Sequence, residues 1–227
     1  MCSRYSLTSP PEAVRAYFRH QNEQVYPPRY NIAPTQPVGI VRIAESGRRE
    51  FQLVRWGLIP PWVKDPRTFA TLINARAETA AEKPSFRGAF RHKRCLVPAD
   101  GFYEWTGPVG AKRPHLIRPR AHGMMAFAGL FESWLGADGS EVDTMAILTV
   151  AANTTVAAVH DRMPAILPSE HFDTWLDCRN VDVRPASALL QPASGDLLEI
   201  IEVDPKLNNS RNEGAQLQQP VGQSRLL

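Results

Sequence analysis

Residues 95–105 read C-L-V-P-A-D-G-F-Y-E-W, and they show in miniature the pattern of the whole chain. Mostly apolar and aromatic residues form two short runs, 95–97 and 101–105, with Pro98 after the first run and Gly101 at the start of the second. Short runs of this kind, bounded by Pro and Gly, are typical of β-strands. This stretch therefore predicts two short strands joined by a tight connection.

The same pattern recurs on both sides of this stretch. Further strands are predicted at 38–43, 51–59, 124–131, 144–151 and 198–203. Short helices are predicted at 154–159, 169–176 and 186–190. Residues 26–37 hold four prolines, so we expect no regular structure there.

An N-terminal helix is predicted from a capping pattern. Ser9 is the expected N-cap, Pro10 the first helical residue and Glu12 the partner that closes a capping box. Val14, Tyr17 and Phe18 then follow at helical spacing and are expected to face the core.

Many short strands with few helices and no regular βαβ alternation indicate one α+β domain. We predict a curved, mainly antiparallel, barrel-like sheet flanked by short helices. The domain is expected to span residues 2–207, and the polar, Gln-rich residues 208–227 to form a C-terminal tail that is disordered or lies over the surface.

The composition is that of an ordinary globular protein, with 227 residues, 43% hydrophobic and 22% charged. We expect a cytoplasmic protein without a membrane span or secretory signal, because no long apolar run occurs. The three cysteines form no C-x-x-C pair, so neither a disulfide scaffold nor a metal site is expected, and no cofactor motif is seen. A net charge of +3 with 21 arginines favours nucleic acid only weakly, since a GC-rich genome gives the same bias.

Cys2 follows the initiator Met1, and a small residue at this position normally allows removal of the methionine. The mature chain would then begin with an amine and a thiol on one residue. An α-amine titrates near pH 8, so part of it is neutral at cytosolic pH and can form a Schiff base with an aldehyde. The adjacent thiol can close a five-membered thiazolidine. The alternative is an unremarkable residue of a frayed terminus.

Three polar residues interrupt apolar or aromatic sequence. Asn74 shares one face with Arg76 and Glu78 if residues 73–78 are extended, which suits a phosphate-bearing ligand or a solvated strand face. Glu104 lies among aromatic residues, so we expect poor solvation and a raised pKa, unless it is simply exposed. His160 lies at a predicted helix end, where it serves either proton transfer or helix capping.

Two stiff loops are expected to contact nucleic acid, although either could equally seal the core. One is P-P-W at 60–62, where Trp62 presents an indole that can stack on a base. The other is R-Y-N-I-A-P at 29–34, which contains Asn31 and Pro34.

Six motifs in order resemble one family. They are M-C-x-R from residue 1, R-Y-N-I-A-P from 29, W-G-L-I-P-x-W from 56, I-N-A-R-A-E-T from 73, P-A-D-G-F-Y-E-W from 98 and H-D-R-M-P from 160. Together they closely resemble the SRAP family, named for SOS-response-associated peptidases and now regarded as abasic-site processing proteins. The resemblance runs from Cys2 to about Val203. At position 3 this chain has Ser where the family more usually has Gly, so the small residue is retained.

The resemblance implies a monomer that captures abasic sites in single-stranded DNA as a covalent thiazolidine. By motif position, Cys2 corresponds to the nucleophile, Asn74 to the residue that orients it, and Glu104 and His160 to acid–base groups. The implied DNA contacts are Arg4, Arg76 and Arg162 on phosphates, with Pro34 and Trp62 in the loops at the DNA bend. Such a protein would associate with the nucleoid when it is bound to DNA.

Two other functions remain open from the sequence. The first is a cysteine peptidase, which could also remove its own Met1, with Cys2 as thiolate, His160 as base and Asn74 or Glu104 orienting the histidine. The second is a noncovalent single-strand binding module that relies on arginines and Trp62.

Overall fold

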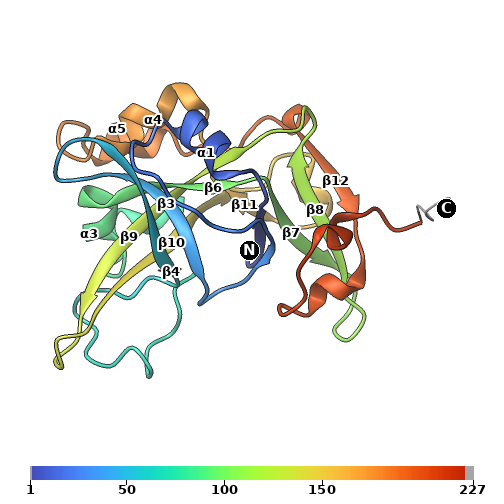
Figure 1. Ribbon diagram of the computed structural model, residues 1–227, viewed down its shortest axis with the longest axis horizontal. Coiled ribbons are helices and arrows are strands. Elements are labelled where there is room, and N and C mark those ends of the chain that lie inside the picture. Colours follow the sequence, from blue (N-terminus) through green and yellow to red (C-terminus); the bar gives the residue numbers. More distant parts are fainter. Residues whose placement is uncertain (1, 223–227) are drawn as a thin grey trace.

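The fold-deciding stretch forms two strands that belong to two different sheets. In the computed structural model, which describes residues 2–222, β6 (Arg94–Ala99) and β7 (Gly101–Thr106) are separated only by Asp100. β6 lies in a seven-stranded sheet and β7 in a five-stranded one (Figure 1). This short connection therefore passes the chain from one half of the domain to the other.

Five strands of the larger sheet close into a barrel. They are β3 (Pro37–Ile43), β4 (Arg49–Trp56), β6, β9 (Met125–Leu135) and β10 (Glu141–Ala151). Around the barrel, β4 pairs with β3, β3 with β6 and β6 with β9. The ring is closed by β10, which pairs with both β4 and β9. Two short strands, β5 (Asn74–Arg76) and β11 (Arg162–Pro164), add to β10. The pairs β10–β4 and β10–β5 are parallel and the others antiparallel.

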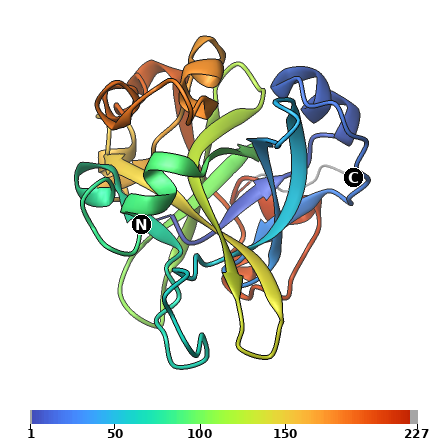
Figure 2. The same cartoon turned by 90° about the vertical axis from the view of Figure 1, so that its left-hand side faces the viewer.

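The five-stranded sheet stands beside the barrel. Its order is β12 (Leu198–Glu202), β8 (Arg113–Pro119), β7, β1 (Tyr5–Leu7) and β2 (Arg29–Ile32), all antiparallel. Figure 2 looks onto the barrel side, where the long β9–β10 hairpin crosses the front. The predicted α+β class with a curved, mainly antiparallel, barrel-like sheet is thus confirmed, with the strands divided between two sheets.

Aromatic packing joins the two sheets. The ring of Tyr5 on β1 meets Trp56 at 5.2 Å and Phe127 at 6.1 Å, both edge to face. Such pairs add to the free energy of burial. Inside the barrel, Gly39 makes room for a ring, because a Cβ there would lie 2.0 Å from Phe51 Cζ.

Short helices flank the barrel. They are α1 (Pro11–Phe18), α2 (Ala77–Ala80), α3 (Arg87–His92), α4 (Phe172–Leu176) and α5 (Val183–Ala188). Figure 1 shows α1, α4 and α5 together over one side, and the stacked rings of Phe18 and Phe172, 5.4 Å apart, hold α1 against α4. Within residues 2–222, the helices are all too short or too polar to span a bilayer.

Three local predictions were wrong. The capping box does not form: Pro10 is the N-cap, and Ser9 instead donates its hydroxyl to the carboxylate of Asp100 (2.7 Å). Of the helix residues expected inside, Val14 and Phe18 are buried, but Tyr17 is partly exposed. Residues 26–37 also contain regular structure, because β2 lies between the proline pairs and bonds to β1.

Residues 208–222 of the predicted tail lie on the domain surface. Residues 205–218, here called the C-terminal strap, include two 3₁₀ turns, Pro205–Asn208 and Ala215–Gln218. Leu207 and Leu217 are buried against Tyr103 and Leu116 of the five-stranded sheet. Residues 223–227 of the predicted tail lie outside the described residues.

Candidate functional site

The N-terminal residues extend β1 and lie along β7. The backbone N–H of Tyr103 donates to the carbonyl of Arg4 at 3.0 Å, and the Cys2 thiol donates to the same carbonyl at 3.7 Å. Cys2 is fully buried. Burial, and then the nearby charge of Glu104, raises the pKa of this thiol far above its usual value. The thiol is therefore protonated at neutral pH and needs a base before it can react.

Asn74 connects the barrel to the N-terminal residues. It is the first residue of β5, which pairs in parallel with β10, and the indole of Trp56 fixes the approach by donating to the carbonyl of Ile73 (2.9 Å). The side-chain amide of Asn74 donates to the Cys2 carbonyl at 2.7 Å. This bond orients the backbone of the residue that carries the thiol.

Glu104 approaches from β7. It is only 3% exposed, although it is ionisable. Burial is the main cause that raises the pKa of its carboxyl group to about 7. The expectation of a poorly solvated carboxyl group with a raised pKa is thus confirmed. Near neutral pH the group is available in both protonation states, as acid–base work requires.

His160 lies in the turn just before β11, with Nε2 4.0 Å from Glu104 Oε2. Its Nδ1 accepts the backbone N–H of Arg162 at 2.9 Å, yet Asp161 Oδ1 also lies 2.9 Å from the same nitrogen. We favour the backbone bond, because that N–H is fixed while the Asp161 side chain is exposed. The neutral ring then carries its proton on Nε2, facing Glu104. Burial lowers the pKa of His160, which favours this neutral form.

Several polar atoms at this place are buried without a hydrogen-bond partner within residues 2–222. They include Arg4 Nε, Asn74 Oδ1 and Arg162 Nε. Buried polar atoms are nearly always paired, so each of these unpaired atoms is one whose partner a ligand or a water molecule can supply. The unpaired atoms lie on residues that the sequence predicted for the site.

The two barrel arginines differ in their surroundings. Arg76 ends β5 and is exposed. Arg162 is only 13% exposed and forms a fork with Glu78 at 2.6 and 2.8 Å, while its Nη2 also donates to the carbonyl of Thr149 at 2.6 Å. This hydrogen bonding lowers the pKa of Glu78. Arg162 is therefore held by a carboxylate, and Arg76 is the arginine that is open to a phosphate.

Among the three predicted loop contacts, Asn31 requires a correction. It is fully buried, and its amide group donates to the carbonyls of Leu207, Asn209 and Asn212 in the strap. As placed, its side chain is closed off from solvent and docks the C-terminal strap. Pro34 is half-buried, and Trp62 is 56% exposed, with its ring edge-on to Phe69.

Glu78 also departs from its prediction. Asn74, Arg76 and Glu78 would share one face only if residues 73–78 were extended, but β5 ends at Arg76 and Glu78 lies in helix α2. Its pairing with Arg162 could not be predicted from local patterns, because the two residues are 84 positions apart.

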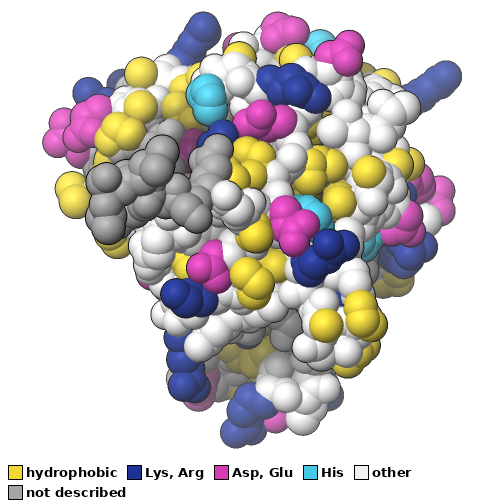
Figure 3. Space-filling model, turned by 90° about the vertical axis from the view of Figure 1, so that its right-hand side faces the viewer, with side chains coloured by type: hydrophobic (Ala, Val, Ile, Leu, Met, Phe, Trp, Pro, Cys, Tyr) yellow, Lys and Arg dark blue, Asp and Glu magenta, His cyan; other side chains and the backbone are white. Residues whose placement is uncertain are grey.

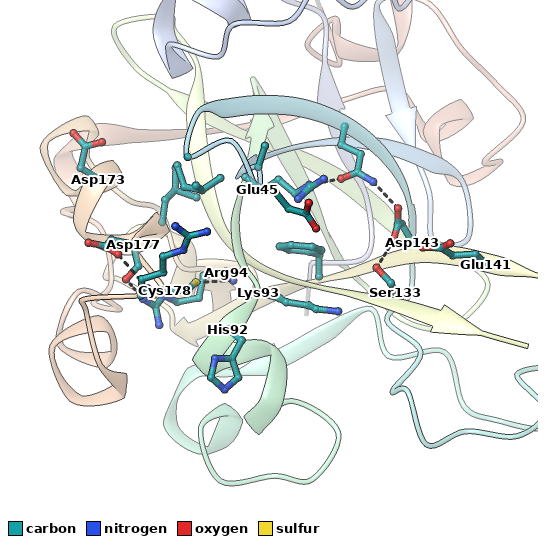
Figure 4. Close-up of a pocket in the computed structure, with 18 residues that line it drawn as sticks. Glu45, His92, Lys93, Arg94, Ser133, Glu141, Asp143, Asp173, Asp177 and Cys178 are labelled. Atoms are coloured by element: carbon teal, nitrogen blue, oxygen red, sulfur yellow. Dashed lines mark hydrogen bonds between the residues drawn. The ribbon is translucent and has the colours of Figure 1, made fainter.

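A cavity of about 730 Å³ lies elsewhere, between the β3–β4 and β9–β10 hairpins and the segment after α4 (Figure 4). None of the predicted site residues lines it. Three of its polar side chains are hydrogen-bonded together: Asp143 accepts from Ser133 at 2.6 Å and also from Gln52. No group of three or more metal-binding side chains occurs within residues 2–222. The candidate site is therefore identified by its reactive residues and not by the volume of a cavity.

Comparison with known proteins identifies the family. The family model of SOS response associated peptidases (SRAP) matches residues 1–210. The chain belongs to the SRAP family. One SRAP relative, the abasic site processing protein YoqW of Bacillus subtilis, is 38% identical over 96% of this chain and 98% of its own. Another, the abasic site processing protein HMCES of Xenopus tropicalis, is 30% identical over 93% of this chain and 76% of its own.

Solved structures also match the fold. A crystal structure from Bacteroides thetaiotaomicron superposes with a TM-score of 0.86 at 28% identity, covering 97% of this chain and all of that one. A second, from Bordetella bronchiseptica, gives 0.77 at 27% identity, covering 89% of this chain and all of that one. The SRAP assignment therefore rests on sequence and on fold.

Proposed function

We propose that the protein captures abasic sites in single-stranded DNA as a covalent thiazolidine through Cys2, after Met1 has been removed. Two of its relatives are named abasic site processing proteins. The observation that carries the proposal is the convergence of Cys2, Asn74, Glu104 and His160 from four distant segments. The Asn74 amide donates a hydrogen bond to the Cys2 carbonyl, and the charge of Glu104 helps to raise the pKa of the Cys2 thiol. His160 Nε2 lies 4.0 Å from Glu104 Oε2.

The proposed reaction needs only the Cys2 amine, the Cys2 thiol and the Glu104 carboxyl group. The neutral Cys2 amine adds to the aldehyde carbon of a ring-opened abasic deoxyribose and gives a carbinolamine. Protonated Glu104 donates to the hydroxyl group, which leaves as water, and an iminium forms. The sulfur then bonds to the same carbon, while its proton passes to the Glu104 carboxylate. A neutral thiazolidine and a protonated Glu104 result, so the carboxyl group is restored.

The raised pKa of the thiol supports this order of steps. A buried, protonated thiol leaves the first attack to the amine, and it closes the ring once the carboxylate has formed. A cysteine peptidase requires the opposite, a thiolate prepared by histidine. The sulfur instead donates to the Arg4 carbonyl. A noncovalent binding module has no use for a buried carboxyl group with a pKa of about 7.

Mass spectrometry tests the proposal directly. The mature protein, incubated with a single-stranded oligonucleotide that carries one abasic site, should give one covalent species of protein plus oligonucleotide minus one water. The same strand with an intact base at that position is the control. A protein that retained no abasic strand after heating in SDS would refute the proposal.

The DNA surface gives a second prediction. Replacing exposed Arg76 with Ala should lower the salt slope of single-strand binding by about 0.7, the value for one phosphate contact, with little change in stability. Arg162→Ala should also lower the free energy of unfolding, by about 1–3 kcal/mol, because it leaves Glu78 and the Thr149 carbonyl without their partner. Binding at several salt concentrations and thermal unfolding measure the two effects. An unchanged slope in Arg76→Ala would remove this residue from the DNA surface.

A further inference from the structure

The carboxylate of Asp100 holds the chain just after β1 through four hydrogen bonds, here called the Asp100 clamp. Oδ2 accepts the backbone N–H of Thr8 at 2.5 Å, the Thr8 hydroxyl at 3.0 Å and the backbone N–H of Ser9 at 2.7 Å. Oδ1 accepts the Ser9 hydroxyl at 2.7 Å. Asp100 forms no ion pair with any residue in the range 2–222, so these donors are the partners of its charge. Hydrogen bonds to a carboxylate are stronger than those between neutral groups.

The clamp lies at one end of the strand pair whose other end carries the reactive residues. β1 and β7 are antiparallel, with Tyr5 opposite Phe102. Cys2 lies three residues before Tyr5, and Glu104 lies two residues after Phe102, so both are reached in the same direction from this pair. The register of β1 against β7 therefore sets where the Cys2 backbone lies relative to Glu104. A slip by one residue would turn each side chain to the opposite face, and a slip by two would displace Cys2 by about 7 Å.

Other contacts constrain this register less. β1 has only three residues, Tyr5–Leu7. Its pairing with β2 shifts between Tyr5 and Leu7, so β2 does not impose a single register. The Tyr5 ring packs on Trp56 and Phe127, but apolar packing is not directional. The clamp thus supplies directional bonds that tie the end of β1 to the connection between β6 and β7.

The charges on the outer side of the five-stranded sheet offer no other means of seating β1. Over the described residues, Figure 3 shows basic and acidic side chains interspersed on the side that carries this sheet and the strap. Because no field of one sign results, we do not expect a bound DNA strand to press β1 into place from this side. The alignment therefore depends on contacts within the protein.

We propose that Asp100 is a positioning residue for the capture reaction: its carboxylate fixes the register of β1 against β7 and thereby the place of Cys2 relative to Glu104. The proposal rests on the capture of abasic DNA proposed above. Asp100 acts through Thr8 and Ser9, at the opposite end of β1 from Cys2, and takes no part in the proton transfers.

Thiol alkylation tests the clamp without DNA, because the three cysteines report on different places. Cys2 lies in the site, Cys95 is fully buried on barrel strand β6, and Cys178 is half-buried beside the remote cavity. The mature protein is treated with iodoacetamide near neutral pH, and peptide mass spectrometry gives the rate at each cysteine. In Asp100→Ala, the rate at Cys2 should rise about 10- to 100-fold, the range expected when hydrogen bonds to a charged group are lost. Cys95 should stay protected, and Cys178 should react as in the wild type.

Two further variants refine the test. Combining Thr8→Val with Ser9→Ala removes the two hydroxyl donors and keeps both backbone bonds, so the rate at Cys2 should rise less, by about 3- to 10-fold. Asp138→Ala is the matched control, because Asp138 accepts the N–H and the hydroxyl of Ser140 within the β9–β10 turn. Its Cys2 should be alkylated at the wild-type rate.

With abasic single strands, Asp100→Ala should lower the rate at saturating DNA roughly 10- to 100-fold, the cost of a small misplacement of a reacting group. The half-saturating DNA concentration should stay unchanged. Equal rises in alkylation at Cys2 and Cys95 would show that Asp100 supports the whole fold, and would overturn the proposal. An unchanged rate at Cys2 would overturn it too, even if the wild-type protein captured DNA. Wild-type protein that captured no strand would refute the proposed function, and alkylation would still decide whether the clamp fixes Cys2.

Discussion

Replacing Cys2 with Ala is expected to abolish the heat-stable adduct with abasic single-stranded DNA. The substituted residue still offers an α-amine, and this amine can form a Schiff base. An imine is reversible in water, however, and without a thiol it cannot close the thiazolidine ring. Denaturing gels after heating, with and without prior borohydride reduction, separate the two species, because reduction traps the imine alone.

Cys178→Ala is the matched control for this experiment. Its thiol is half-buried, accepts the backbone N–H of Arg94 and lines the remote cavity of Figure 4. This variant should form the adduct at the wild-type level. A Cys2→Ala adduct that survived heat and SDS without reduction would show that the sulfur is not part of the bond.

Glu104→Gln should slow adduct formation by about 10²–10⁴-fold, the usual contribution of a general acid–base group, while the mass of the final adduct stays the same. Single-turnover reactions at saturating DNA measure this rate. Glu45→Gln, at an exposed glutamate near the remote cavity, is the control and should react at the wild-type rate.

The pH dependence of the rate of adduct formation shows in which protonation state Glu104 acts. The raised pKa of about 7 means that Glu104 is protonated below pH 7, when it can donate to the leaving hydroxyl, and ionised above it. The Cys2 amine, in contrast, becomes nucleophilic as pH rises through about 8. Wild-type rates should therefore pass through a maximum between pH 7 and 8. In Glu104→Gln the fall at high pH should disappear. A bell-shaped profile that persisted in this variant would assign the acid to another group.

The local pattern of the sequence predicted a good part of this molecule. Short apolar runs bounded by Pro and Gly indicated most of the barrel strands, because most strands of this domain are short and end at turns. The aromatic neighbours of Glu104 predicted the raised pKa, because Phe102 and Tyr103 are adjacent in the chain and both are buried. β8 was not predicted, and β2 was predicted to be irregular, since their pairing partners, and not their own composition, make them strands.

The position of Asn31 shows what such reasoning misses. Its motif indicated a stiff loop at the DNA surface, and the structure buries it under the strap. Residues 208–218 of the strap were predicted to belong to a tail, disordered or lying over the surface, because they are polar. The polar groups of the strap are instead satisfied by Asn31, Tyr103 and the backbone, and two buried leucines anchor it.

The sequence by itself determined the fold class, the family and the chemical types of the reactive residues, since these depend on residue identity and on spacing along the chain. Only the tertiary structure decided which of them meet. Asn74 reaches Cys2 across 72 positions, Arg162 reaches Glu78 across 84, and Arg4 reaches Leu207 across 203. Contacts over such separations follow from the register of two sheets and the docking of the strap. A shift of one residue in a strand turns each side chain to the opposite face, so local periodicity cannot specify them.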